Sequence, residues 1–196
     1  LLGEGVPMEV IDRVAARFGF PVGPITLLDE VGLDVAAKAS KVMHRAFGDR
    51  LTPSDLIEKL LASQRLGRKN GKGFYGYHKG QRTGPDESVY DLLGIRPARP
   101  ASTELVEQRL VYSMLNEAAM AAGEGVVRAA RDGDIGAIFG IGYPPFRGGP
   151  LRYLDDLGAA RVVGLLRDLQ QRFGARFAPA ESLVRMADAG ERFYHD

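Results

Sequence analysis

The chain has 196 residues, of which 45% are hydrophobic and 26% charged, so it can bury the core of one or two domains. Its formal net charge of +1 excludes the strong positive field that nucleic-acid binding needs. The absence of cysteine excludes disulfides, thiol catalysis and Cys-ligated metal, and no apolar run reaches the roughly 18 residues of a membrane-spanning helix. The chain opens on Leu1-Leu2-Gly3-Glu4 without an initiator Met, which predicts a fragment that starts within the end of a helix.

The first half of the sequence shows apolar residues at helical spacing, interrupted by glycine and proline. These patterns predict helices over residues 7–18, 24–31, 35–47 and 53–61. Pro24 and Pro53 fit the first turn of a helix, and Gly19, Gly32 and Gly48 fit helix ends. The third helix is predicted to bury one face, which consists of Val35, Ala39, Val42, Met43, Ala46 and Phe47. No alternating strand pattern is recognised in this half.

A basic, glycine-rich segment follows over Arg65–Pro85. Its three aromatic residues provide apolar anchors, so we expect an ordered loop that lies across the core. Val89–Leu93 predicts one short helical turn, and Arg96–Pro100 predicts an extended connector. We therefore expect a first helical unit over residues 1–80, a connector over residues 81–100 and a second unit over residues 101–196.

The second half also predicts only helices. Ser102 caps a long helix that runs to about Glu124. Asp134 is predicted to cap a short helix over Ile135–Phe139, which leads into a Gly/Pro-rich stretch over Phe139–Gly158. Further helical patterns follow over residues 151–157, 162–173 and 179–186. The predicted fold class is therefore all-α.

The two halves share a constant spacing of the residues that punctuate the helices. Gly23-Pro24 matches Gly149-Pro150 at an offset of 126 residues. The same offset relates Leu28-Asp29 to Leu154-Asp155, Gly32 to Gly158, Phe47-Gly48 to Phe173-Gly174 and Pro53 to Pro179. Generic punctuation of helices by glycine and proline is the alternative explanation. We predict a tandem duplication of one helical unit, whose copies pack together to bury faces that neither buries alone.

Several familiar types of site are absent from the sequence. Gly71–Gly76 fits the dinucleotide-binding pattern G-x-G-x-x-G, and Asp91 lies about 20 residues further on, but no strand precedes the glycines and no helix follows them. The three histidines, His44, His78 and His195, lack the setting of a positioned acid–base residue. No His, Asp or Glu cluster has the spacing of metal ligands. The chain is predicted to hold no catalytic, cofactor-binding or metal-binding residue.

Two groups of charged residues leave alternatives open. The cations of Arg65–Lys72 fit either a solvated basic loop, which the sequence favours, or contact with a phosphate-rich ligand. The carboxylate pairs Asp29-Glu30 and Asp155-Asp156 lie at corresponding places in the two copies. This correspondence favours a structural task, such as accepting hydrogen bonds from loop amides, over a catalytic one.

Four stretches together resemble a known family. They are GFPVGPITLLDEVGLD (Gly19–Asp34), GRKNGKGFYGY (Gly67–Tyr77), LNEA (Leu115–Ala118) and RDGDIGAIFGIGYPPFRGGPLRYLDDLG (Arg131–Gly158). Over nearly its whole length the chain resembles the C-terminal helical region of the 3-hydroxyacyl-CoA dehydrogenases. More narrowly, it is similar to the alpha subunits of bacterial fatty-acid oxidation complexes, which are bifunctional enoyl-CoA hydratases/3-hydroxyacyl-CoA dehydrogenases, in the version associated with anaerobic growth.

The resemblance implies a cytoplasmic bacterial β-oxidation enzyme that hydrates an enoyl-CoA and then oxidises the (3S)-3-hydroxyacyl-CoA to the 3-ketoacyl-CoA with NAD. It implies that the hydratase domain, the NAD-binding Rossmann domain, the catalytic His–Glu dyad and a substrate-contacting Asn all precede Leu1. This chain alone is then expected to be inactive and to bind no NAD. The implied partners are the acyl-CoA substrate, the missing domains, a second copy in a homodimer and a thiolase subunit.

For this chain itself the resemblance implies a wall of the substrate cleft. Some relatives contact substrate through a Tyr near the Gly-rich loop, and the matching position here is Phe139, whose contact with the acyl-CoA would be apolar. Phe139 and Tyr143 are the candidate substrate-binding residues, with a plain core role as the alternative for Phe139. The extra residues of the second copy, Ile141–Arg147, are where a substrate contact is expected, while contact of Arg65–Lys72 with coenzyme A stays open. The rival function is a structural dimerisation or assembly module without ligand contact.

Overall fold

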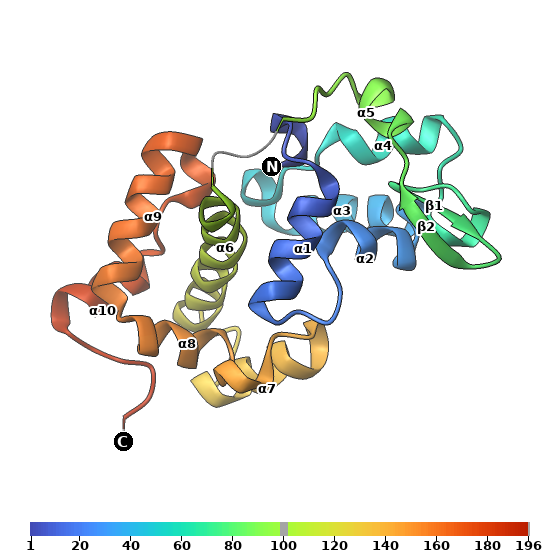
Figure 1. The fold of residues 1–196 in the computed structure, drawn as a ribbon. Coiled ribbons are helices and arrows are strands. Elements are labelled where there is room, and N and C mark those ends of the chain that lie inside the picture. The colour runs from blue at the N-terminus through green and yellow to red at the C-terminus, as the bar shows by residue number, and fades with distance from the viewer. Residues whose placement is uncertain (99–101, 196) are drawn as a thin grey trace. The chain divides into compact units, whose positions relative to one another are not determined.

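The computed structural model describes residues 1–98 and 102–195, and it divides the chain into two compact units (Figure 1). Unit 1 comprises Leu1–Arg17 and Val22–Val106, and unit 2 comprises Phe18–Pro21 and Glu107–Asp196. The short stretch Phe18–Pro21 therefore folds with the second half of the chain. The last two residues of the predicted connector Arg96–Pro100 lie outside the described residues.

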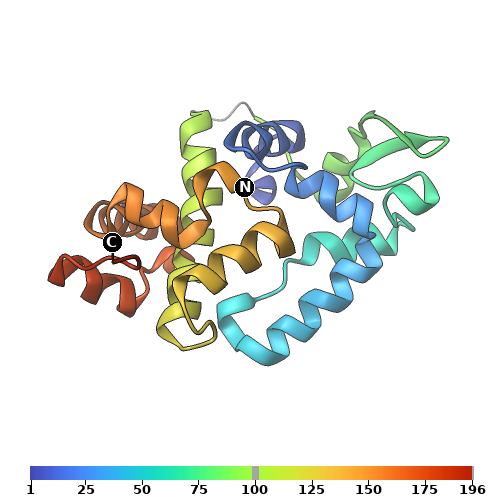
Figure 2. The same cartoon turned by 90° about the horizontal axis from the view of Figure 1, so that it is seen from below.

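The described residues before position 99 form five α-helices, three 3-10 turns and one hairpin. The elements are η1 (Leu2–Glu4), α1 (Met8–Phe18), α2 (Pro24–Val31), α3 (Leu33–Phe47), η2 (Gly48–Leu51), α4 (Asp55–Ala62), η3 (Arg68–Asn70), β1 (Tyr75–His78), β2 (Gln81–Pro85) and α5 (Ser88–Leu93). Helix α3 packs beside α4 (Figures 1 and 2). The core beneath these helices includes Met8, Leu33, Leu60 and Phe74.

The described residues after position 101 are helical apart from their connections. The elements are α6 (Thr103–Gly123), α7 (Ala130–Ile141), η4 (Pro145–Arg147), α8 (Pro150–Leu157), α9 (Ala159–Phe173), η5 (Ala175–Phe177) and α10 (Glu181–Ala189). Leucines from α6, α8, α9 and α10 are fully buried, and they form the core of unit 2. The predicted all-α fold is confirmed. In the part of the chain that the structure describes, no helix is long and apolar enough to cross a membrane.

The order of the helices confirms the tandem duplication. The first copy contains α1, α2, α3 and α4. The second copy contains their counterparts in the same order, which are α7, α8, α9 and α10. Helices α2 and α8 each have 8 residues and begin with the repeated Pro, and α3 and α9 each have 15 residues. Each of these pairs keeps the offset of 126 residues that the sequence showed.

The expectation that the first half contains no strand is wrong. Tyr75–His78 and Gln81–Pro85 pair as an antiparallel hairpin, with a register shift between Gly76 and Tyr77. Lys79 and Gly80 both have positive φ, at 51° and 76°, which is the geometry of a two-residue hairpin turn. The strands were missed because four residues with an irregular register cannot show a clear alternation. The predicted ordered loop over Arg65–Pro85 is therefore partly a β-hairpin.

The predicted buried face of α3 is also wrong. Its members are exposed, whereas α3 buries Leu33 and Ala37 on another side. In the second copy the residue that matches Phe47 is Phe173, and the guanidinium of Arg109 from α6 lies 4.0 Å from the centre of its ring. In unit 1 the guanidinium of Arg50 lies 5.7 Å from the ring centre of Phe47, which remains 43% exposed.

Candidate functional site

Helix α2 begins at Pro24 after Gly23, which has no side chain that could cap it. The carboxylate of Asp12, on α1, provides the cap instead. It accepts hydrogen bonds from the amides of Ile25, at 2.8 Å, and Thr26, at 3.0 Å. It also accepts one from the hydroxyl of Tyr75, at 2.8 Å. Asp12 is buried, so these bonds satisfy a charge that water does not reach.

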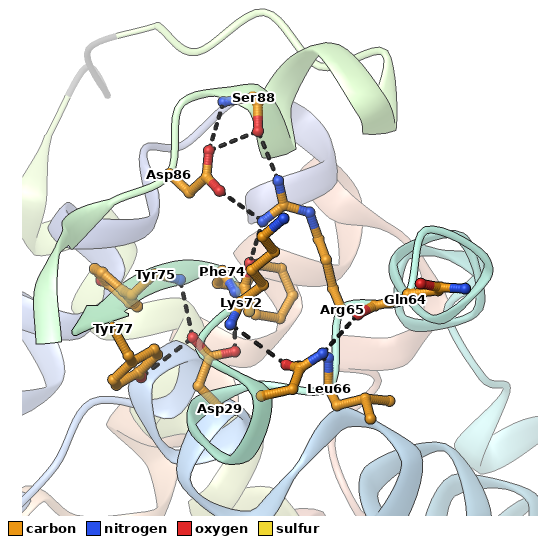
Figure 3. A network of polar contacts seen from close by, with 12 residues as sticks. Asp29, Gln64, Arg65, Leu66, Lys72, Phe74, Tyr75, Tyr77, Asp86 and Ser88 are labelled. Carbon is orange, nitrogen blue, oxygen red and sulfur yellow. Dashed lines mark hydrogen bonds and ion pairs between the residues drawn. The ribbon is translucent and has the colours of Figure 1, made fainter. Parts of the chain in front are cut away.

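A second carboxylate, Asp29 on α2, holds the start of the hairpin (Figure 3). It accepts hydrogen bonds from the amides of Phe74 and Tyr75, both at 2.9 Å, and from the hydroxyl of Tyr77 at 3.2 Å. Asp29 has no exposed surface, and this burial raises its pKa against the opposing effect of the three donors. Asp12 and Asp29, which we call carboxylate pair 1, therefore bind the same Phe-Tyr dipeptide, Phe74-Tyr75.

Unit 2 repeats this arrangement with different surroundings. Asp134, on α7, accepts hydrogen bonds from the amides of Leu151 at 2.7 Å and Arg152 at 3.0 Å, and from the hydroxyl of Tyr194 at 2.6 Å. Asp155, on α8, accepts hydrogen bonds from the amides of Phe193 and Tyr194, both at 2.9 Å. Asp134 and Asp155, which we call carboxylate pair 2, thus bind the dipeptide Phe193-Tyr194.

The predicted structural task of Asp29 and Asp155 is confirmed, because both accept hydrogen bonds from loop amides. Their predicted companions do something else: Glu30 pairs with Arg68, and Asp156 lies near Arg152. The expectation that Asp134 caps its own helix is wrong. Helix α7 begins at Ala130, so Asp134 lies one turn inside it and caps α8.

Glycine is required where each helix meets its carboxylate. A Cβ at Gly23 would lie 2.3 Å from the Oδ1 atom of Asp12, and a Cβ at Gly149 would lie 2.3 Å from the Cβ of Asp134. Such distances are far below van der Waals contact. The repeated Gly-Pro therefore marks a close approach between two helices, which gives the pattern in the sequence a physical reason.

Most basic side chains of the segment Arg65–Lys72 form hydrogen bonds or ion pairs with residues of unit 1. Arg65 is buried, and its guanidinium donates to the carbonyl of Gly73 at 2.8 Å, to Asp86 at 2.7 Å and to Ser88 at 2.6 Å (Figure 3). Arg68 pairs with Glu30, and Lys69 pairs with Asp34. Three of the four cations of the segment therefore have partners within their own unit.

The segment Gly71–Gly76 does not fit NAD. The only G-x-G-x-x-G pattern, Gly71–Gly76, leads into strand β1 and not into a helix. The amides of Phe74 and Tyr75, which a pyrophosphate would need, donate to Asp29 instead. No step of a nucleotide reaction can therefore be assigned to this segment.

The Gly/Pro-rich loop between α7 and α8 is held by an aromatic cluster of unit 2. The cluster consists of Phe18, Phe20, Tyr143 and Tyr153, whose neighbouring rings have centres 5.6–6.0 Å apart. The guanidinium of Arg147 lies 3.9 Å from the ring centre of Phe18, and its Nε donates to the carbonyl of Phe18 at 3.1 Å. The loop is therefore anchored from within, by residues that precede α2 in the sequence.

The structure separates the two candidate substrate-binding residues. Phe139, in the last turn of α7, is 86% exposed, so its alternative role as a core residue is wrong. Tyr143 is only 1% exposed and is part of the aromatic cluster. Its hydroxyl has no hydrogen-bond partner among the described residues, and burial raises its pKa, so it stays protonated. Of the two side chains, only that of Phe139 is open to solvent.

Phe139 is one of four exposed apolar side chains in α7 and in the loop that follows it. We call this set the α7 apolar surface, and it comprises Ile135, Phe139, Ile141 and Phe146. The two phenylalanines are the most exposed of the four, at 86% for Phe139 and 74% for Phe146. Among residues 1–98 and 102–195 no group of three His, Asp or Glu side chains could hold a metal ion. The four side chains can offer only apolar contact, because none of them carries a group that exchanges a proton.

The sequence patterns did not predict the residues that act together with Asp29 and Asp155. They are Asp12 and Tyr75 in unit 1, and Asp134 and Tyr194 in unit 2. One signal was available, because Phe-Tyr occurs at residues 74–75 and again at residues 193–194. Each occurrence follows the fourth helix of its copy. This match was overlooked because its offset is 119 residues, and not the 126 of the helices.

Comparison with known proteins identifies the family. The model of the 3-hydroxyacyl-CoA dehydrogenase C-terminal domain matches residues 1–77 and residues 105–193. The chain is 52% identical over 196 residues to the fatty acid oxidation complex subunit alpha of Shewanella amazonensis, and 51% identical over 195 residues to that of Shewanella loihica. These alignments cover 99% of this chain and 28% of each relative, so the chain spans little more than a quarter of their length.

Solved structures agree with this assignment. The dehydrogenase part of multifunctional enzyme 1 from C. elegans aligns with a TM-score of 0.65 and 26% identity, over 92% of this chain and 42% of that chain. The 3-hydroxybutyryl-CoA dehydrogenase of Escherichia coli K12 shares the fold, with a TM-score of 0.71 and 23% identity over 94% of this chain and 55% of that chain. The chain therefore belongs to the family of the 3-hydroxyacyl-CoA dehydrogenase C-terminal domain.

Proposed function

We propose that the chain is the helical part of an alpha subunit of a fatty acid oxidation complex, and that it forms one wall of the site that binds the acyl-CoA. The parent enzyme then hydrates an enoyl-CoA and oxidises the (3S)-3-hydroxyacyl-CoA with NAD, which yields the 3-ketoacyl-CoA, NADH and a proton. The proposal is supported by the family match over both copies and by the two relatives with this name. A bacterial cytoplasmic location and a thiolase subunit as partner are part of the same proposal.

The observation that carries the role of this chain is the exposed ring of Phe139. It lies on the α7 apolar surface beside a loop that an internal aromatic cluster holds in place. A fixed apolar surface suits the acyl chain of a thioester, because burial of an aliphatic chain needs no directional partner. Tyr143 supports this surface from inside the unit.

Titration calorimetry with acetoacetyl-CoA tests this role. We expect the chain to bind, and we expect Phe139→Ala to weaken binding about tenfold through the loss of apolar contact. Phe47→Ala is the matched control, since Phe47 is also an exposed phenylalanine at the end of a helix but lies in unit 1. Equal affinities of the three proteins would refute the assignment of Phe139.

We also propose that the chain alone neither binds NAD nor catalyses the reaction. Support comes from the Gly71–Gly76 segment, which does not fit NAD, and from the settings of the histidines. His44 lies near the carbonyl of Gly48 at 3.0 Å, and His78 and His195 are exposed. The purified chain should leave NADH unconsumed in the presence of acetoacetyl-CoA. A measurable rate of NADH oxidation above the protein-free control would overturn this statement.

The second candidate function is an assembly module, which the exposed stripe of α3 favours. Val35, Val42, Met43 and Phe47 lie on this stripe, and a homodimer contact or a contact with the missing dehydrogenase domains would cover it. Sedimentation velocity over a concentration series distinguishes the two candidates. A concentration-dependent dimer that Val42→Glu abolishes, together with no binding of acetoacetyl-CoA, would favour assembly over the substrate wall.

A further inference from the structure

The two carboxylate pairs hold their Phe-Tyr dipeptides by the same three kinds of hydrogen bond. In each unit the carboxylate on the short helix, Asp29 or Asp155, accepts from both backbone amides of the dipeptide. The carboxylate on the preceding helix accepts from the tyrosine hydroxyl and from two amides at the start of the short helix. One arrangement is thus kept in both copies although the segments that carry the dipeptides differ, a β-strand in unit 1 and the segment after α10 in unit 2.

The two dipeptides differ in how firmly the rest of the unit holds them. Tyr75 is buried and begins strand β1, and the carbonyl of Phe74 accepts a further hydrogen bond from the amide of Asp86. Tyr194 is partly exposed and lies in residues 191–195, which form neither helix nor strand after α10 (Figure 1). The second dipeptide therefore depends far more on its carboxylate pair.

Asp134 connects the second dipeptide to the loop that carries the α7 apolar surface. The same carboxylate accepts from Tyr194 and caps α8, which starts directly after the loop at Pro150. The guanidinium of Arg152, whose amide Asp134 also binds, lies 5.2 Å from the ring centre of Tyr194. Loss of the hydrogen bond from Tyr194 would therefore alter the carboxylate that caps the first turn of α8.

We propose that carboxylate pair 2 is a docking site for an aromatic–tyrosine dipeptide. Phe193-Tyr194 occupies this site as a releasable strap. While it is bound, the strap holds the start of α8 and the preceding loop in position. Two backbone amides give the site its affinity for an extended segment. The tyrosine hydroxyl gives it selectivity, because a phenylalanine at the second position cannot donate to Asp134. Release of the strap leaves Asp134 with two of its three donors and loosens the cap of α8.

Hydrogen exchange followed by NMR tests this proposal on the whole chain. Tyr194→Phe removes only the hydroxyl, and it should speed exchange at the amides of Leu151 and Arg152 about tenfold, because one hydrogen bond to a buried carboxylate is lost. The matched control is Tyr75→Phe, which should affect Ile25 and Thr26 but leave Leu151 and Arg152 unchanged. Unchanged exchange at Leu151 and Arg152 in Tyr194→Phe would overturn the proposal.

A variant that ends at Arg192 tests the docking site itself. Exchange at Leu151 and Arg152 should increase, and a synthetic peptide of residues 188–196 added in trans should restore protection at these two amides. The same peptide with phenylalanine in place of Tyr194 should restore it only at about tenfold higher concentration. A faster exchange that extends equally over α9 and α10, or equal rescue by both peptides, would refute a local, tyrosine-selective site.

Discussion

The close approach of Gly23 to Asp12 predicts a large loss of stability when a single methyl group is added. In Gly23→Ala the new Cβ would lie 2.3 Å from the Oδ1 atom of Asp12 and 2.4 Å from its Cα and Cβ. Rotation of the aspartate side chain cannot relieve the clash, because the Cα is part of helix α1. The φ of Gly23 is −74°, so alanine meets no backbone strain and the cost is steric.

The magnitude follows from what must move. Overpacking at a tight contact costs about 1–3 kcal/mol. Separation of α1 from α2 also weakens the hydrogen bonds from Ile25 and Thr26 to the Asp12 carboxylate, each worth about 1.5–3 kcal/mol. Alanine recovers about 0.4–1 kcal/mol by restricting the unfolded chain. We expect a net loss of about 3 kcal/mol or more, which is a large part of the stability of a typical domain.

Urea denaturation followed by circular dichroism measures this loss. Gly164→Ala is the control, since a Cβ at this exposed position of α9 meets nothing within 4 Å. This control should gain about 0.5–1 kcal/mol, because alanine favours the helix interior. A Gly23→Ala protein whose free energy of unfolding lies within about 0.5 kcal/mol of the wild type would refute the close contact between the two helices.

Three further predictions concern buried polar groups. Burial raises the pKa of Asp29 above its ordinary 3.8, so its contribution to stability is fully present below that pH and is lost as the pH rises through the folded value. The free energy of unfolding of the wild type relative to Asp29→Asn should therefore fall as the pH rises above 3.8, and a rise in urea titrations would contradict this sign. Arg65→Ala should lower the free energy of unfolding by about 3 kcal/mol in the same titrations, because it leaves the carbonyl of Gly73 and the carboxylate of Asp86 without their donor. The control Arg68→Ala should change this free energy little, because Arg68 is exposed. Tyr75→Phe should lower the free energy of unfolding by about 1.5–3 kcal/mol, because it removes the hydrogen bond to Asp12. Tyr143→Phe should be neutral or stabilising. Equal losses of stability in thermal melts of the two variants would show that the hydroxyl of Tyr143 has a partner.

The helices and their duplication were predictable because local signals mark them. Pro24 and Pro150 favour the first turn of a helix, and the glycines before them sit where only a hydrogen atom fits. The hydrogen bonds of Asp29 and Asp155 to loop amides were also predictable, since acids at matching places of two copies point to a shared structural task.

The remaining contacts were not predictable, because they join residues far apart in sequence. Asp12 and Tyr75 are 63 residues apart, and helical periodicity says nothing of which distant segment meets a polar side chain. The stripe of α3 shows a related limit. Its apolar spacing predicts a buried face, but it does not indicate that these side chains stay exposed in unit 1. The sequence likewise could not distinguish an exposed Phe139 from a buried one, because apolar spacing does not show which side chains are covered.

The most direct test of the account is to find where an acyl-CoA touches the chain. Photolabelling with an acyl-CoA whose acyl chain carries a diazirine, followed by peptide mass spectrometry, reports the residues that lie beside the acyl group. The account predicts labelling within Ile135–Phe146, which competing acetoacetyl-CoA removes and Phe139→Ala reduces. Labelling confined to Arg65–Lys72 or to α3, with none on the α7 apolar surface, would contradict it.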